Sequence, residues 1–101
     1  FSYMALIKAE DPNIKHAIDL LEGIKHYVSE QAINPDHSVE LLGPIPAAMS
    51  RKAGVHRAHL LLSSENRSAL QRLTLHVCHW LNSNHWGKSR WMIDIDPIEI
   101  N

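Results

Sequence analysis

Two strands and the loop between them are predicted by the stretch Glu40-Leu-Leu-Gly-Pro-Ile-Pro-Ala-Ala-Met-Ser-Arg-Lys-Ala-Gly-Val-His-Arg-Ala-His-Leu-Leu-Leu62. We expect a brief strand over residues 39–42, because the prolines of Gly43-Pro44-Ile45-Pro46 lack the N–H donor that a sheet ladder needs. A basic loop follows, which Ala53-Gly54 interrupts, and a second strand then runs from Val55 to Ser63. The segment therefore predicts β-structure around a loop rich in Pro and Gly.

The two ends of the chain predict the remaining strands. Residues from Phe1 to Ala9 are mostly apolar on both alternating sides, which suits a central strand. The ending Arg90-Trp-Met-Ile-Asp-Ile-Asp-Pro97 alternates under β-favouring residues and stops at its proline. Because Trp91 is in phase with Ile93 and Ile95, we expect its side chain in the core.

Two amphipathic helices are predicted between these strands. Asp11 is the expected N-cap of the first, with Pro12 at the first helical position, and Asn34-Pro35-Asp36 ends the helix. Its apolar residues recur at spacings of three and four and comprise Ile14, Ala17, Ile18, Leu21, Ile24, Tyr27, Val28 and Ala32. Polar residues at 63–66 precede the second helix, whose buried stripe is Leu70, Leu73, Val77 and Leu81.

The order of these elements is β-α-β-β-α-β, the split βαβ arrangement of ferredoxin-like folds. We expect an α+β fold in which two helices cover one face of a four-stranded antiparallel sheet. A chain of 101 residues suffices for one small core, and no repeat or linker divides it. The prediction is a single domain over residues 1–101.

Composition narrows the classes of protein. The chain is 45% hydrophobic and 21% charged, without an apolar run as long as a membrane span, so no membrane partner is expected. The single Cys78 cannot form an intrachain disulfide and fits a reducing cytoplasm. The start at Phe1, without Met, suggests a piece of a larger protein. Residues 51–90 hold seven basic side chains against one acidic, whereas residues 1–50 hold three basic against seven acidic.

Several kinds of catalytic or ligand site are not expected. Gly87-Lys88-Ser89 has the tail of a phosphate loop, but position 82 lacks the required Gly and a strand follows, so we expect no ATP hydrolysis. One cysteine and scattered histidines, among them His76, His79 and His85, do not make a structural zinc site. Asp94 and Asp96 share one side of a strand without a visible cleft, and no nucleophile motif occurs. We therefore predict no catalytic residue, cofactor or metal.

The basic half of the chain carries the candidate binding site, which would contact nucleic acid. Cations attract phosphates in a salt-dependent way, and exposed aromatic rings stack on unpaired bases. We expect Trp86, in a polar loop, to be exposed. The predicted nucleic-acid-binding residues are Arg51, Lys52, His56, Arg57, Trp86, Lys88 and Arg90.

Three patterns in this order carry a resemblance to a known family. They are Phe-Ser-Tyr-x-Ala-Leu-Ile-x-Ala at Phe1, Leu-Leu-Gly-Pro-x-Pro-Ala at Leu41, and Asp-x-Asp-Pro at Asp94. Across its whole length the chain resembles the carboxyl-terminal domain of bacterial PriA, the replication-restart DNA helicase also called primosomal protein N-prime. The resemblance implies a DNA-binding or accessory domain without the helicase motor.

The resemblance further implies that the intact protein is an ATP-dependent 3′ to 5′ DNA helicase in the bacterial cytoplasm. It would act at stalled or D-loop forks, contact single-stranded DNA-binding protein and start primosome assembly. ATP, magnesium and zinc would belong to other parts of that protein, since nothing here matches the family's cysteine-rich zinc region. The partners implied for this segment are single-stranded or forked DNA, bound weakly, and the rest of the helicase.

Three alternatives remain open. RNA-recognition modules share the topology, but they place aromatic residues on the third strand, which here reads Val55-His-Arg-Ala-His-Leu-Leu. A structural docking domain would pack its uncovered sheet face on the parent protein, through the apolar residues Met4, Leu6, Leu60, Leu62 and Met92. A small-ligand regulatory domain is the third alternative.

Overall fold

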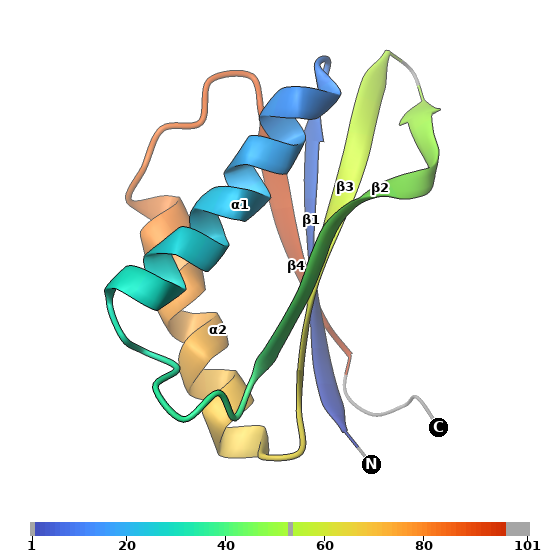
Figure 1. Ribbon diagram of the computed structural model, residues 1–101. Helices are drawn as coiled ribbons and strands as arrows, with labels where there is room; N and C mark the ends of the chain where they lie inside the picture. The colour runs from blue at the N-terminus through green and yellow to red at the C-terminus, as the bar shows by residue number, and fades with distance from the viewer. Residues whose placement is uncertain (1, 53, 97–101) are drawn as a thin grey trace.

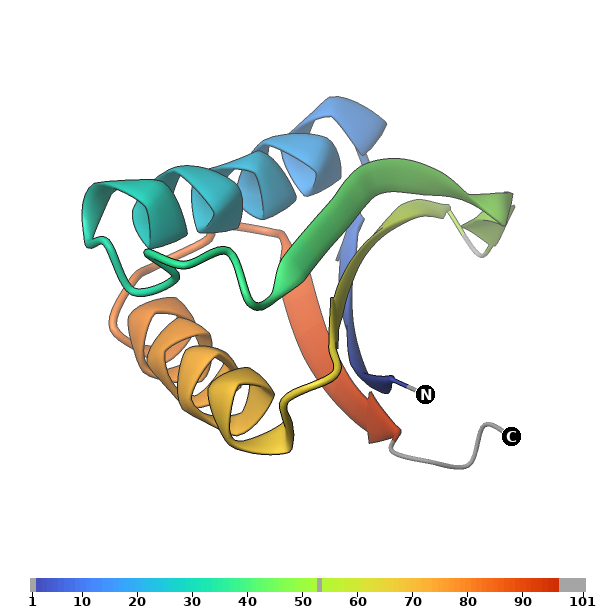
Figure 2. The ribbon, with the colours of Figure 1, turned by 60° about the horizontal axis from the view of Figure 1, so that its bottom comes forward.

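The computed structural model describes residues 2–52 and 54–96, with the backbone alone at residues 48–52 and 96. The elements follow in the order β1 (Tyr3–Asp11), α1 (Ile14–Glu30), β2 (Glu40–Lys52), β3 (Val55–Ser64), α2 (Arg67–Asn82) and β4 (Arg90–Asp96). The strands form one antiparallel sheet in the order β2-β3-β1-β4. Both helices lie on the same side of it (Figures 1 and 2). The predicted ferredoxin-like arrangement is therefore confirmed.

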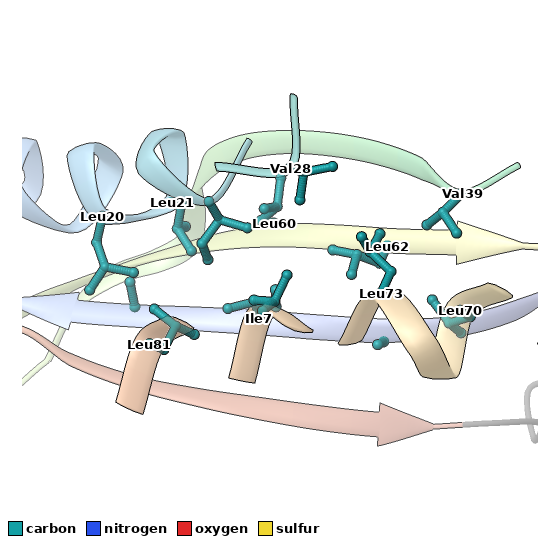
Figure 3. Packing of buried hydrophobic residues seen from close by; sticks show 14 of the residues in the cluster. Ile7, Leu20, Leu21, Val28, Val39, Leu60, Leu62, Leu70, Leu73 and Leu81 are labelled. Atoms are coloured by element: carbon teal, nitrogen blue, oxygen red, sulfur yellow. The ribbon is translucent and has the colours of Figure 1, made fainter. Parts of the chain in front are cut away.

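The core lies between the helices and the sheet (Figure 3). On β1, Ala5, Ile7 and Ala9 are fully buried, whereas the residues between them are half-buried. Leu60 and Leu62 of β3 lie directly opposite Ile7 and Ala5 and are fully buried as well. Since opposed residues of an antiparallel pair point to one face, odd positions of β1 and even positions of β3 form the face under the helices.

Helix α1 begins two residues later than predicted. Its N-cap is Asn13, whose side chain accepts a hydrogen bond from the backbone N–H of Lys15. Asp11 is the last residue of β1, and its carboxylate accepts from the N–H of Asn13 at 2.7 Å. The predicted cap was wrong because Asp11 and Asn13 are both favourable N-cap residues, and Asp11 belongs to β1. The stripe also includes Leu20, which the prediction missed.

Strand β2 is much longer than the predicted segment, since it continues through both prolines. It is an edge strand, so one side needs no N–H donors, and its pairing with β3 shifts register between Leu42 and Ile45 and again after Pro46. Gly43 has a φ of +117°, and a Cβ there would lie 2.8 Å from the carbonyl oxygen of His59. Lys25 of α1 donates to the carbonyl of Gly43 at 2.9 Å, which holds the strand against the helix.

Helix α2 follows the prediction closely. Its N-cap Asn66 accepts from the N–H of Ala69, and the four predicted stripe residues are all buried. Trp80 stacks on Tyr27 of α1 at a centroid distance of 4.9 Å. Gly23 permits this approach, because a Cβ there would lie 3.3 Å from the Trp80 ring. The two helices are thus joined through an aromatic contact.

Candidate nucleic-acid interface

The strand ends that carry most of the residues predicted to contact nucleic acid lie at one end of the sheet, the upper end in Figure 1. Strand β2 ends there with Arg51 and Lys52, β3 begins there with Val55 and His56, of which His56 is opposite Arg51, and β4 begins with Arg90. The side chains of Arg51 and Lys52 lie outside the described residues, so their role in binding stays a prediction. The topology therefore brings together segments that are distant in the sequence.

Two of the predicted arginines form a row across the face that the helices leave open. Arg57 of β3 and Arg90 of β4 both lie directly opposite Glu10 of β1. Nε of Arg57 donates to Oε2 of Glu10 at 2.6 Å, with 40% and 30% of the two side chains exposed. Because a guanidinium group has about five N–H donors, most donors of Arg57 are not used by this contact. The row presents two guanidinium groups with one carboxylate between them.

This row borders a hollow of about 600 Å³ on the open face, called the sheet hollow below. Lys8 contributes a third cation to it, and Nζ of Lys8 lies 3.6 Å from Oδ2 of Asp94 on β4. Cationic and apolar side chains line the same space. The lining residues are Leu6, Lys8, Glu10, Ala47, Arg57, His59, Arg90, Trp91 and Met92.

The pKa of His59, which lines the sheet hollow, is shifted by its surroundings. His59 lies on β3 directly opposite Lys8 of β1 and Ile45 of β2, two residues from Arg57. Burial lowers the pKa of His59 below its usual range, and the positive charges of Lys8 and Arg57 lower it further. The imidazole is therefore held neutral at neutral pH, and an anion bound nearby would favour its protonation.

Sequence reasoning missed three charged residues of this site: Lys8, Glu10 and Asp94. Lys8 and Glu10 alternate with the buried Ile7 and Ala9 along β1, so the alternation alone places them on the opposite face. What the alternation does not give is the pairing register, which brings Glu10 to Arg57 and Lys8 to His59. Long-range pairing thus decides which charges meet.

Three predicted residues lie away from the sheet hollow. His56 is opposite the buried Asp11, hence on the helix side of β3. Lys88 and Trp86 line a second hollow, of about 670 Å³, beside the start of α1. Trp86 is half-buried rather than exposed: its indole N–H donates to the carbonyl of Leu81 at 2.9 Å, and its ring meets Trp80 edge-on at 5.2 Å. The expectation of a free stacking ring at Trp86 was therefore wrong.

Trp91, which we expected in the core, packs against it but stays half-buried. Its Cα lies opposite Ala9, in the predicted phase with Ile93. Ile95, in the same phase, is largely exposed. The two tryptophans Trp86 and Trp91 are therefore similar in burial, against the predicted contrast between them.

Asp11 fixes the segment that leads into β4. Its carboxylate is buried and accepts from the Ser89 hydroxyl at 2.6 Å and from the Asn13 N–H, with Nδ1 of His16 at 3.4 Å. Burial alone would raise the pKa of Asp11, but the hydrogen bonds from Ser89 and Asn13 and the charge of His16 together lower it. Since Ser89 precedes Arg90, this anchor helps to position the arginine row.

The open face also carries exposed apolar side chains. Leu42 and Ile45 of β2 and Met92 of β4 are 49%, 60% and 57% exposed. Leu6 lines the sheet hollow beside Met92. The prediction that Leu60 and Leu62 lie on this face was wrong, because both are buried under the helices and Leu61 faces the open side instead.

Within residues 2–52 and 54–96 there is no group of three or more His, Cys, Asp and Glu side chains arranged to hold a metal ion. His76, His79 and His85 are exposed. Sγ of Cys78 lies 3.6 Å from the Asn82 side-chain nitrogen. No helix in the described part of the chain is long and apolar enough to cross a membrane.

Comparisons with known proteins identify relatives along the whole chain. The family described as the primosomal protein N C-terminal domain matches residues 1–98. The replication restart protein PriA of Haemophilus influenzae is 31% identical over 101 residues, which cover 100% of this chain and 13% of that protein. The chain thus spans only a small part of the length of this relative.

Solved structures with the same arrangement share little sequence. A de novo designed protein, Foldit4, matches with a TM-score of 0.67 at 13% identity, over 98% of this chain and 100% of its own. A dimeric ferredoxin-like protein from an uncultured marine organism matches with a TM-score of 0.61 at 6% identity, over 99% and 97% of the two chains. At such identities the likeness concerns the fold alone.

Proposed function

Because this chain belongs to the family of primosomal protein N C-terminal domains, we propose that it serves as a DNA-contacting accessory domain of a larger replication-restart protein. The observation that supports this role is the row formed by Arg57, Glu10 and Arg90 on the helix-free face. Guanidinium groups bind phosphate oxygens well because their planar forks match phosphate geometry. Lys8 adds a third cation within the same hollow.

The balance of charge indicates a weak contact. Glu10 engages Arg57 and Asp94 engages Lys8, so two of the three cations are partly neutralised by neighbours. Among the side chains that the structure describes, Arg90 has no ion-pair partner. Arg51, Lys52 and Lys88, at the same end of the sheet, would extend the contact beyond the hollow. We expect about three phosphates to be engaged, which gives ionic binding with little sequence preference.

The context of this contact follows from the same family. The parent protein would be an ATP-dependent 3′ to 5′ DNA helicase of the bacterial cytoplasm that restarts stalled forks, and its ATP, magnesium and zinc sites would lie elsewhere in its chain. This domain would perform no catalysis. Its partners would be single-stranded or forked DNA, the remainder of the helicase, single-stranded DNA-binding protein and other primosome proteins.

A second candidate function is docking on the parent protein. The exposure of Leu42, Ile45 and Met92 on one face favours it, since an apolar surface of this kind is typical of an interaction site. Leu42 and Ile45 belong to the edge strand β2, whereas Arg90 is on the opposite edge strand, β4. The open face is therefore wide enough to divide between the two functions.

The test is fluorescence anisotropy with labelled single-stranded and forked oligonucleotides at several salt concentrations. We expect the logarithm of the affinity to fall with the logarithm of salt at a slope of about −2 to −3. The double variant Arg57→Gln/Arg90→Gln should lose at least about tenfold in affinity and retain its melting transition, since two charge-assisted contacts are removed.

Arg72→Gln is the matched control, because Arg72 is an exposed arginine on α2, and Glu22→Gln tests the acidic side of α1. Both should bind DNA like the unaltered chain. Binding that is absent at low salt, or that does not respond to the double variant, would exclude the DNA contact and leave docking as the function.

A further inference from the structure

The sheet hollow changes character along β1. The row at Glu10 holds two arginines, the next row places Lys8 between His59 and Met92, and the row after that places Leu6 between Leu61 and Asp94. Successive rows on one face are about 6.6 Å apart, because side chains on one side of a strand repeat every two residues. A ligand in the hollow therefore meets guanidinium groups at one end and apolar side chains at the other.

Resting on the DNA contact proposed above, we propose that the sheet hollow takes one unpaired nucleotide, with its phosphate at Arg57 and Arg90 and its base against Met92 and Leu6. A nucleotide carries a charged phosphate and a base with apolar faces on opposite sides of its sugar, which matches the order of the rows. The volume of about 600 Å³ lies within the range of small-ligand sites.

The shape of the site favours an unpaired strand over a duplex. In a duplex the bases are paired and stacked, and moving one into a hollow costs the energy of unstacking and unpairing. An unpaired base has no such cost, and it covers apolar side chains that are otherwise in water, Met92 above all. Sequence-independent binding of single strands elsewhere combines cations with aromatic rings on which the bases stack, and here the apolar side chains of Met92 and Leu6 take the place of those rings.

The experiment measures the contribution of the base to affinity separately from that of the phosphate. Anisotropy titrations at low salt compare three labelled probes of equal length: an oligothymidylate, an oligomer with the same phosphates but abasic sites throughout, and a duplex. We expect the oligothymidylate to bind at least about fivefold more tightly than the abasic oligomer, the lower end of what one base contact supplies. It should also bind more tightly than the duplex, although the duplex carries more phosphates.

Variants assign the effect to the hollow. Met92→Ala should weaken binding of the oligothymidylate about threefold or more and leave binding of the abasic oligomer unchanged, and Met92→Leu should restore most of the loss. Met92 is largely exposed, so the substitution leaves the core intact. Leu75→Ala, on the exposed side of α2, is the matched control and should change neither titration.

Each other outcome is decisive. Equal affinity for the oligothymidylate and the abasic oligomer would overturn the nucleotide site while the proposed DNA contact stands. Duplex binding as tight as single-strand binding would overturn it as well. Failure of all three probes to bind would instead remove the proposed function. Displacement of the oligothymidylate by a peptide of alternating Asp and Leu, at lower concentration than unlabelled DNA, would overturn the nucleotide site in favour of an acidic peptide.

Discussion

The two faces of β1 differ in the burial and in the polarity of their side chains. Toward the helices it presents Ala5, Ile7 and Ala9, all fully buried, and toward the open side Leu6, Lys8 and Glu10, all half-buried. Small and large apolar residues alternate on the first face because α1 and α2 pack against it. On the second face each charge is held by a neighbour in the sheet, such as Arg57 or Asp94. The residues that stabilise the fold and those of the proposed binding site thus lie on opposite faces of one strand, and substitutions can address them independently.

The largest effect should come from two adjacent leucines of β3 that point to opposite faces. Leu60→Ala should lower the free energy of unfolding by about 2–5 kcal/mol, because it leaves a cavity in the core. Leu61 is half-buried on the open face, so Leu61→Ala should lower the free energy of unfolding by less than about 1.5 kcal/mol. Urea denaturation of both variants measures the difference. Equal losses would mean that the faces are not distinct in packing.

A smaller loss should follow from removing the anchor of the β4 entry. Ser89→Ala deletes a hydrogen bond to the buried carboxylate of Asp11 and should cost about 1.5–3 kcal/mol at pH 7. Ser83→Ala is the control, because its hydroxyl donates at an exposed helix end, and it should cost less than about 1 kcal/mol.

The contact between Ser89 and Asp11 should also make the stability of the fold depend on pH. The folded-state pKa of Asp11 is lowered from 3.8, so its ionised form stabilises the fold above that pH, and the contribution is lost as pH falls through the folded-state pKa. Ser89→Ala removes one cause of the lowering. The gap between the variant and the unaltered chain in denaturant melts should therefore narrow from pH 7 to pH 3. A gap that stays constant would show that Asp11 does not act through its charge.

The smallest effect concerns His59 on the open face. Its pKa is lowered in the free protein, and a bound phosphate would raise it again, so binding takes up a proton. DNA affinity should therefore rise about two- to fivefold as pH falls from 8 to 6 at constant salt. His59→Gln should flatten this dependence, while the other seven histidines remain as an internal control. If the affinity of His59→Gln depends on pH as strongly as that of the unaltered chain, the proton taken up on binding belongs to another group.

The sequence predicted the parts of this molecule that local patterns determine. The stripe from Leu70 to Leu81 fits one helical period, and both helix stripes and the element order follow from such repeats. The run Leu60-Leu61-Leu62 shows where this fails, because three identical residues have no phase until pairing with β1 assigns two of them to the core. Strand β2 was predicted too short for a related reason: prolines are tolerated at the edge of a sheet, and only the tertiary arrangement decides which strand is an edge.

The candidate site was predicted in part for the same reason. The cluster of basic residues indicated Arg57 and Arg90, but their shared neighbour Glu10 is distant in sequence from both. Trp86 was expected in water because its neighbours are polar. It packs on Trp80 because α2 and the segment after it turn back on each other, which local composition does not encode.

The three tryptophans of this chain lie in two different places, so their fluorescence can report on different events. Two of its three tryptophans lie together in the helical layer, and the third, Trp91, lines the sheet hollow. Loosening of the helices changes the surroundings of all three, because Trp91 also packs against the core, whereas occupancy of the hollow changes those of Trp91 alone. With Trp91→Phe as the reference, intrinsic fluorescence can follow ligand and denaturant in one unlabelled sample and assign the change caused by ligand to the hollow.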